Sequence, residues 1–367
     1  MERNIFKNDE LQKQFERNGF VKLPMLEKEE VKILRDYYAN QEFDNKVEAG
    51  FHISLDNQDE DLVKEVGGRI KEILVPRMTE LLDDCQVFTA SYVIKEPGLK
   101  NIVPPHQDWT FVDENEFCSA TVWTALVDVS EQNGALGVIP GSHKIFNHKR
   151  SSPSPQSKSP LADHIFTLFP FVEVIEMNAG ESLIFDNRLI HASPPNLSDQ
   201  ARIAVGIGIT QSEAKLKHFY QNPSSGKLEE YDVDQSFFTW FNNKRLSDLF
   251  DSGNSPEGAA LSGSKGLNKV GEIDRVVPDL AKDEMEAKVQ ELEGVEYNRP
   301  FMERLAKLFN YSVDGEKQSD AKEHDELAES DQEQKKWKDD RTFFQKYSFG
   351  NIVREIVWRF RGKPNMN

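Results

Sequence analysis

Ser182-Leu-Ile-Phe-Asp-Asn-Arg-Leu-Ile-His191-Ala-Ser193 is the stretch from which the fold of this chain can be predicted. An apolar-rich run that ends in polar residues is typical of a buried β-strand. Arg202 opens the next apolar run, Arg202-Ile-Ala-Val-Gly-Ile-Gly-Ile-Thr210. Short strands separated by glycine, proline and asparagine turns predict a β-rich barrel or sandwich, with His191 and Arg202 on neighbouring strands.

A histidine-X-aspartate triplet, His106-Gln107-Asp108, lies upstream of this stretch. Residues i and i+2 of a strand point to the same face, so His106 and Asp108 can offer two ligands from one strand end, with Gln107 facing away. His191 would then arrive from a separate strand. Two imidazoles and one carboxylate are the ligand set that holds Fe(II) and leaves positions open for other molecules. The spacing therefore predicts an iron site.

The order of these residues matters more than the triplet itself. A chain with 8 His and 63 acidic residues contains about one or two such triplets by chance. His191 alone would also fit a purely structural role. Arg202 follows His191 by eleven residues and can hold a carboxylate with two parallel hydrogen bonds, which a lysine cannot do. The full set therefore predicts an iron enzyme with a dicarboxylic co-substrate, 2-oxoglutarate.

Between about residues 10 and 212 the chain resembles the phytanoyl-CoA dioxygenase family of Fe(II)- and 2-oxoglutarate-dependent oxygenases. The segments that carry the resemblance are Phe15–Pro24, Pro105–Asp108, Thr121–Asp128, Asn133–Lys144, Gly180–Phe185, His191–Ser198 and Arg202. One departure is Glu181, where the family usually has Asp after the glycine. This residue lies at a turn, so the departure leaves the expected site unchanged.

The resemblance implies a mixed α and β fold, with a double-stranded β-helix (jelly-roll) core, flanking helices and a helical C-terminal extension. It implies that His106, Asp108 and His191 bind Fe(II). It also implies that Arg202 pairs with the distal carboxylate of 2-oxoglutarate, with Ser193 hydrogen-bonding nearby. The expected cofactor and co-substrates are Fe(II), 2-oxoglutarate and O2.

The same resemblance implies that Trp123 lines the co-substrate pocket. From its residue type alone it fits a core position equally well. The function that follows is a dioxygenase that hydroxylates an organic small molecule or lipid-like substrate and releases succinate and CO2. A related halogenase would need a small residue in place of Asp108. A non-catalytic jelly-roll binding protein, or an adaptor, stays open as an alternative.

The composition fits a folded enzyme. The chain has 367 residues, 38% of them hydrophobic, and 24 are Phe. Its net charge of −18 argues against a nucleic-acid partner, because phosphate binding needs a positive surface. The two cysteines form no disulfide framework. The first residues lack the apolar run of a signal peptide, and no run approaches a transmembrane segment. We expect a cytoplasmic protein.

Residues 1–212 are expected to form the oxygenase core. Within it, residues 1–85 should be mostly helical, with helices at 27–39 and 60–82, because apolar residues recur there at helical spacing. Residues 86–212 should supply the jelly-roll strands, at 87–94, 119–129, 172–177, 182–190 and 202–210. Residues 151–160 are rich in serine and proline and predict a mobile loop, with a lid over the site as the alternative.

The remaining residues are expected to form an extension. Residues 213–311 should contain loops, a Gly/Ser-rich linker at 252–269, and helices at 281–292 and 300–310. Residues 312–340 are acidic and predict disorder or a solvated helix. Residues 341–367 predict a basic amphipathic helix. Such a helix can bind an anionic membrane surface or a partner, but packing on the body of the protein is the favoured interpretation.

Overall fold

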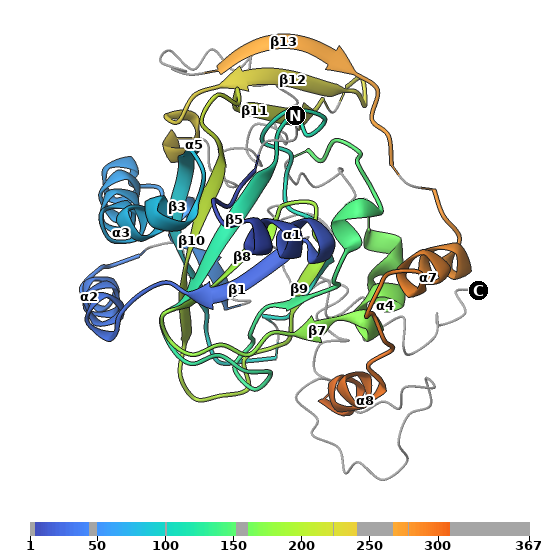
Figure 1. Cartoon of the computed structure of the whole chain (residues 1–367), viewed down its shortest axis with the longest axis horizontal. Helices are drawn as coiled ribbons and strands as arrows, with labels where there is room; N and C mark the ends of the chain where they lie inside the picture. The colour runs from blue at the N-terminus through green and yellow to red at the C-terminus, as the bar shows by residue number, and fades with distance from the viewer. Residues whose placement is uncertain are drawn as a thin grey trace, which may run out of the picture.

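Three antiparallel sheets, with helices on both sides, make up the fold of this protein (Figure 1). The computed structural model describes residues 4–43, 50–99, 101–151, 161–222, 224–240, 267–277 and 279–308. All but the first residue of the predicted loop at 151–160, most of the predicted linker, the acidic segment 312–340 and the basic helix at 341–367 lie outside the described residues. The expected mixed α and β fold is confirmed.

The largest sheet has six strands in the order β1-β8-β5-β10-β3-β2. Their bounds are β1 Phe20–Pro24, β2 Phe51–Ile53, β3 Cys85–Lys95, β5 Ser119–Ala125, β8 Glu181–Asp186 and β10 Arg202–Gln211. Neighbours in the order are far apart in the sequence, so this sheet is held together by long-range pairing. It confirms the strands predicted near 87–94, 119–129 and 202–210.

A smaller sheet has four strands in the order β4-β9-β6-β7. Their bounds are β4 Val103–His106, β6 Gly137–Val138, β7 Glu173–Val174 and β9 His191–Ser193. From β3 to β10 the chain thus passes repeatedly between the two sheets. Side chains of both sheets, including Trp123, Val138, Leu183 and Ala204, share one buried cluster, so the sheets pack face to face.

The prediction of one continuous strand through residues 182–190 is wrong. Strand β8 ends at Asp186, where the carbonyl accepts a hydrogen bond from the Leu189 amide (2.8 Å) and closes a turn. The chain then crosses to the small sheet and begins β9 at His191. Both halves are buried and apolar, so the sequence pattern could not mark the crossing.

Strand β10 shows why this sequence builds the packed sheets. Its even-numbered residues Arg202, Ala204, Gly206 and Gly208 alternate with Ile and Val residues that join the cluster on the sheet's outer face. A strand places alternate side chains on opposite faces. The bulky residues therefore cover the helix side. The inner side of β10 carries small residues and the cation Arg202.

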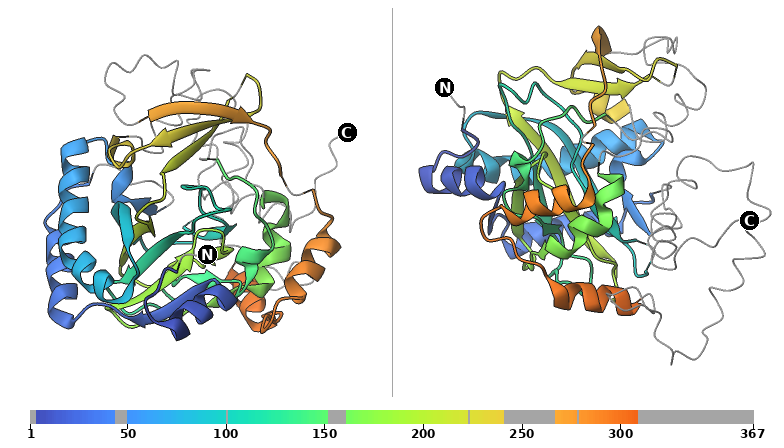
Figure 2. Two further views of the ribbon diagram at one scale, coloured as in Figure 1. Left: turned by 45° about the horizontal axis from the view of Figure 1, so that its top comes forward. Right: turned by 90° about the vertical axis from the view of Figure 1, so that its right-hand side faces the viewer.

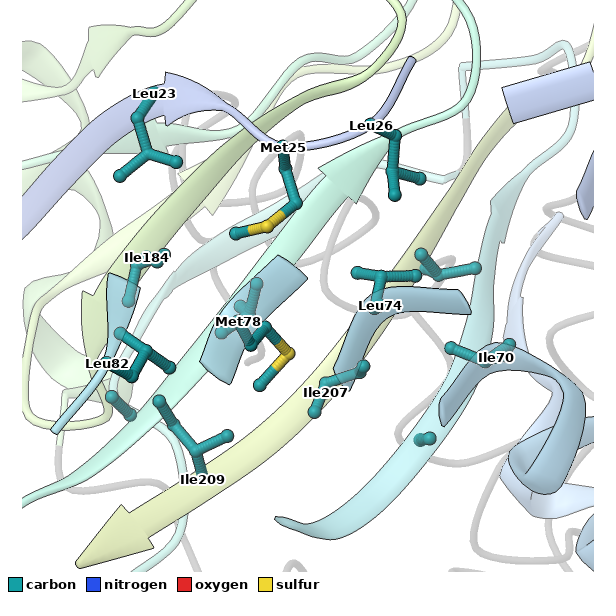
Figure 3. Packing of buried hydrophobic residues seen from close by; sticks show 14 of the residues in the cluster. Leu23, Met25, Leu26, Ile70, Leu74, Met78, Leu82, Ile184, Ile207 and Ile209 are labelled. Carbon is teal, nitrogen blue, oxygen red and sulfur yellow. The ribbon is translucent and has the colours of Figure 1, made fainter. Parts of the chain in front are cut away.

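Helices cover the outer face of the large sheet. They are α1 Asp9–Asn18, α2 Lys28–Ala39 and α3 Glu60–Leu81. Ile70, Leu74 and Met78 of α3 pack against Ile184, Ile207 and Ile209 of the sheet (Figure 3). Burying each of these side chains contributes roughly 1.5–3 kcal/mol, so this contact is a main source of stability. The helices predicted at 27–39 and 60–82 are confirmed.

A second helical layer lies beside the small sheet, on the opposite side of the molecule from α2 and α3 (Figure 2). It contains α4 Ile165–Leu168, α7 Lys282–Gln290 and α8 Arg299–Leu308. Met285 of α7 and Phe301 of α8 enter a cluster with Ile139, Ile190 and Ala192. The helices predicted at 281–292 and 300–310 are therefore confirmed and are packed on the body. The described residues also contain four short 3-10 helices: Ser54–Asp56, Ser142–Lys144, Ala162–His164 and Phe169–Phe171.

The third sheet was not predicted. Strands β11 Lys217–Gln221, β12 Leu228–Val233 and β13 Leu267–Ile273 form it in that order, at the top of Figure 1, with α5 Phe237–Trp240 nearby. The expectation of only loops and helices in residues 213–311 is thus wrong, and Leu267–Lys269 belong to a strand rather than a linker. The division of the chain at residue 212 stays a prediction. Among the described residues, no helix is long and apolar enough to span a membrane.

Candidate metal and co-substrate site

His106, Asp108 and His191 meet at the end of the small sheet. His106 ends β4 and His191 begins β9, and the two are direct cross-strand partners. Asp108 Oδ1 lies 3.8 Å from His106 Nε2 and 3.7 Å from His191 Nε2. One ligand atom from each of the three residues lies within 4.8 Å of the others. The set predicted from the sequence is therefore brought together by the fold.

The two imidazoles are held with their Nε2 atoms toward this centre. His106 Nδ1 lies 2.9 Å from the carbonyl of Pro104, and His191 Nδ1 lies 3.0 Å from the carbonyl of Leu189. A carbonyl can only accept, so each Nδ1 carries a proton, and Nε2 is the ring atom left to bind a metal. Burial, followed by the neighbouring His191, lowers the pKa of His106 to about 4. Two imidazoles whose Nε2 atoms converge in this way suit a divalent metal.

Asp108 reaches the centre from a loop. Strand β4 stops at His106, so the predicted presentation of both ligands from one strand end is only half right. The Asp108 amide donates to the Asn187 carbonyl (2.9 Å), and Thr121 Oγ1 lies 3.4 Å from Asp108 Oδ2. The Arg150 guanidinium donates to the Asp108 carbonyl (2.5 Å) and forms a buried ion pair with Glu114. Hydrogen bonds to the backbone amide and the backbone carbonyl of Asp108 thus fix the position of its carboxylate.

Gln107, the residue between His106 and Asp108, is buried. Its side-chain amide donates to the Arg188 carbonyl (2.5 Å), which lies in the turn between β8 and β9. Gln107 therefore links the loop that carries Asp108 to the turn that precedes His191.

Arg202 lies at the start of β10 and is almost fully buried. Its guanidinium carbon lies 5.0 Å from the centre of the Trp123 ring, close enough for a cation–π contact. Its Nε atom is buried and has no hydrogen-bond partner in the described part of the chain. Burial lowers the pKa of Arg202 to about 9. An enclosed cation with an unmet donor is the arrangement that a bound carboxylate would complete.

Trp123 is a core residue, as its residue type predicted, while its place beside the co-substrate stays a prediction. It contacts Arg202 on one side and belongs to the buried cluster between the sheets on the other. Ser193 lies on β9, two residues beyond His191, so both side chains are on the same face. Its hydroxyl donates to the Gly134 carbonyl (3.0 Å) and contacts the ammonium group of Lys95.

A model of the family described as phytanoyl-CoA dioxygenase (PhyH) matches residues 15–204, more than half of the chain. The chain belongs to the phytanoyl-CoA dioxygenase family. The six residues predicted for the site all lie inside the match, whereas β11–β13, α7 and α8 lie outside it.

Individual relatives agree with this assignment. The phytanoyl-CoA dioxygenase domain-containing protein 1 of Danio rerio is 30% identical over 159 residues, which are 42% of this chain and 54% of that protein. A phytanoyl-CoA dioxygenase of Arabidopsis thaliana is 33% identical over 139 residues, 35% of this chain and 45% of that protein. The chain thus spans about half the length of the curated relatives it matches. One similar solved structure is that of the non-heme alpha ketoglutarate dependent carbocyclase SnoK from nogalamycin biosynthesis, which is 21% identical in sequence. The match covers 57% of this chain and 86% of that chain, with a TM-score of 0.43.

Several residues around the site were missed by sequence reasoning. Thr121 had a usable signal, because it lies two positions before Trp123 and so shares its strand face. Arg150, Glu114 and Lys95 had none, since isolated charged residues in a sequence normally predict exposed positions. Only the fold shows that the side chains of all three are buried beside the candidate site.

The third sheet also contacts the site region. Trp109 follows Asp108 directly, and Phe111 lies two residues further on. The Phe111 carbonyl accepts a hydrogen bond from the Lys217 amide of β11 (2.7 Å). The Trp109 ring lies 6.2 Å from the His218 ring of the same strand. The segment beyond the family match therefore supports the loop that carries the carboxylate ligand.

Proposed function

We propose that this protein is an Fe(II)- and 2-oxoglutarate-dependent dioxygenase that hydroxylates an organic small molecule or a lipid-like substrate. The observation that carries the proposal is the convergence of two Nδ1-protonated imidazoles and the Asp108 carboxylate, beside a buried Arg202. The alternation of β3–β10 between two facing sheets supports a jelly-roll core, and membership of the family supports the chemistry.

The donor set fits the metal. Two neutral nitrogens and one carboxylate oxygen suit Fe(II) and leave part of its coordination sphere open. His106, Asp108 and His191 would hold it. When bound, iron supplies the activation of O2 that is coupled to conversion of 2-oxoglutarate into succinate and CO2.

The protein's own groups would orient the co-substrate. Arg202 would hold the distal carboxylate of 2-oxoglutarate in a two-point ion pair, and the Ser193 hydroxyl lies on the strand that begins with a metal ligand. Trp123 closes one side of Arg202 and keeps water from it. A fixed carboxylate anchor and a fixed metal together define where the 2-oxo acid group lies.

The experiment is anaerobic loading with Fe(II) and 2-oxoglutarate, followed by exposure to oxygen with a metabolite extract. We expect stoichiometric iron binding, a visible absorbance band on addition of 2-oxoglutarate, oxygen-dependent succinate and a product heavier by one oxygen atom. A His191→Ala variant serves as the control without a metal site. A product that gains chlorine would indicate a halogenase. Absence of both iron binding and succinate would indicate a binding or adaptor protein.

A further inference from the structure

We propose that Lys95 is a second cation of the co-substrate site and binds the same carboxylate as Arg202. This inference rests on the proposed use of 2-oxoglutarate. Lys95 lies at the end of β3, eleven positions before His106.

The register of the large sheet places the two cations together. Lys95 of β3 and Arg202 of β10 are direct cross-strand partners, so their side chains lie on the same face of the sheet. That face is the one that Trp123 shares, because Arg202 stacks on its ring. Lys95 is completely buried, and Arg202 is 2% exposed.

The ammonium group of Lys95 is held beside Ser193. It contacts the Ser193 hydroxyl, and it lies 2.6 Å from the Pro194 carbonyl and 3.4 Å from the Ser193 carbonyl. Gly134 makes room for it, because a Cβ at this glycine would lie 2.6 Å from Lys95 Cδ and 2.9 Å from the Pro194 carbonyl. Lys95, Ser193 and Arg202 therefore surround one small region.

The charges in this region do not balance. Among the described residues, neither Lys95 nor Arg202 forms an ion pair with a carboxylate, and the hydrogen bonds of the Lys95 ammonium are to neutral oxygens. Burial and the nearby Arg202 hold the pKa of Lys95 well below its usual range. Buried cations are retained in proteins when a partner compensates them. A dicarboxylate has two oxygens at its far end, so it can bind the guanidinium and the ammonium together.

A purely structural lysine would behave differently. It would fasten the 193–194 carbonyls to β3 and would affect every ligand of the site alike. A lysine that binds the distal carboxylate would affect only ligands that have one. Comparing 2-oxoglutarate with 2-oxopentanoate, which keeps the 2-oxo acid and lacks the distal carboxylate, separates these roles.

The test uses the full chain with Lys95→Met, which removes the donor, and Lys95→Gln, which keeps hydrogen bonds to carbonyls but loses the charge. Dissociation constants of the two 2-oxo acids are measured by absorbance on anaerobic Fe(II)-loaded protein, and that of glutarate by calorimetry on metal-free protein. A charged hydrogen bond predicts about a tenfold to hundredfold weaker binding of 2-oxoglutarate and glutarate in both variants. Binding of 2-oxopentanoate should stay within about twofold of the wild type. Lys22→Gln, at an exposed lysine of β1, is the matched control and should change nothing.

Equal losses for both 2-oxo acids, or wild-type binding of 2-oxoglutarate by Lys95→Gln, would overturn the role of Lys95 while leaving the proposed function in place. A wild-type protein that binds neither 2-oxo acid would overturn the proposed function and this inference with it. If both variants fail to fold, NMR of the lysine Nζ nitrogens in the wild-type protein gives the answer. Glutarate must then shift the Lys95 signal, and an unshifted signal in glutarate-saturated protein would contradict the contact.

Discussion

At the scale of single residues, the backbone of the small sheet determines how the proposed metal-binding histidines point. The carbonyls of Pro104 and Leu189 each lie two residues before a histidine and accept from its Nδ1. Both contacts are local to the strand ends, so forming β4 and β9 already selects the tautomer. The site is thus arranged before any metal binds, which lowers the cost of binding.

Asp108→Ala should abolish stoichiometric Fe(II) binding and succinate formation, because two imidazoles alone leave the metal without its charged ligand. The fold should persist, since the anchors of this loop are backbone groups and the Arg150–Glu114 pair. Metal analysis and circular dichroism measure the two effects. Asp113→Ala, a half-exposed carboxylate of the same loop, is the matched control and should keep its iron. An Asp108→Ala protein with normal turnover would contradict the site.

Arg202→Ala should weaken binding of 2-oxoglutarate by about 2–5 kcal/mol, because a buried carboxylate then loses its charged partner. Fe(II) binding should change little, since Arg202 is not among the three clustered ligands. Titration of the anaerobic Fe(II) protein gives both constants. Arg202→Lys should recover only part of the loss, because an ammonium cannot form the two-point contact. Unchanged affinity in Arg202→Ala would rule out this role.

At the scale of elements, helix α8 is integrated into the body through its apolar face. Phe301, Met302 and Leu305 enter the cluster beneath the small sheet, whereas Arg304 forms a half-exposed ion pair with Glu131. Desolvated apolar contacts contribute much more than exposed ion pairs. The extension should therefore unfold together with the core.

Phe301→Ala should lower the free energy of unfolding by about 3–5 kcal/mol, the usual cost of removing a buried aromatic side chain. Arg304→Ala on the same helix should cost about 0–1 kcal/mol, because exposed pairs are screened by solvent. Denaturant unfolding followed by fluorescence measures both changes. Similar small effects for the two variants would indicate that α8 is only loosely attached.

At the scale of the whole molecule, burial of histidines away from the metal centre makes stability depend on pH. Burial lowers the pKa of His143 and His148 to about 4 and that of His218 to about 3. In the unfolded chain these groups have a pKa near 6.5. Between these values the unfolded state binds more protons than the folded state, so stability must fall as the pH falls.

The metal-free protein should accordingly lose stability as the pH is lowered from about 7 to about 5, where few carboxylates titrate. Thermal unfolding across this range, at constant ionic strength, measures the trend. His148→Asn should reduce the slope, since one buried histidine no longer gains a proton on unfolding. A melting temperature that does not change with pH in this window would contradict the prediction.

The sequence by itself determined the local features of this protein. Helical spacing of apolar residues was enough for α2, α3, α7 and α8, because each helix buries a stripe that the 3.6-residue period marks. The ordered set His106, Asp108, His191 and Arg202 was enough to predict one site, since few chemistries need those residue types in that order.

Only the tertiary structure decided the features that depend on contacts between distant segments. The crossing from β8 to β9 is invisible in the sequence because both strands are equally buried. The third sheet escaped prediction because β11–β13 carry a mixed polar pattern and β13 pairs with β12 across a long separation. Lys95 and Arg150 looked like surface residues, and cross-strand register and loop packing made them buried neighbours of the site. Periodicity records which face of an element is buried, but sheet register determines which side chains meet.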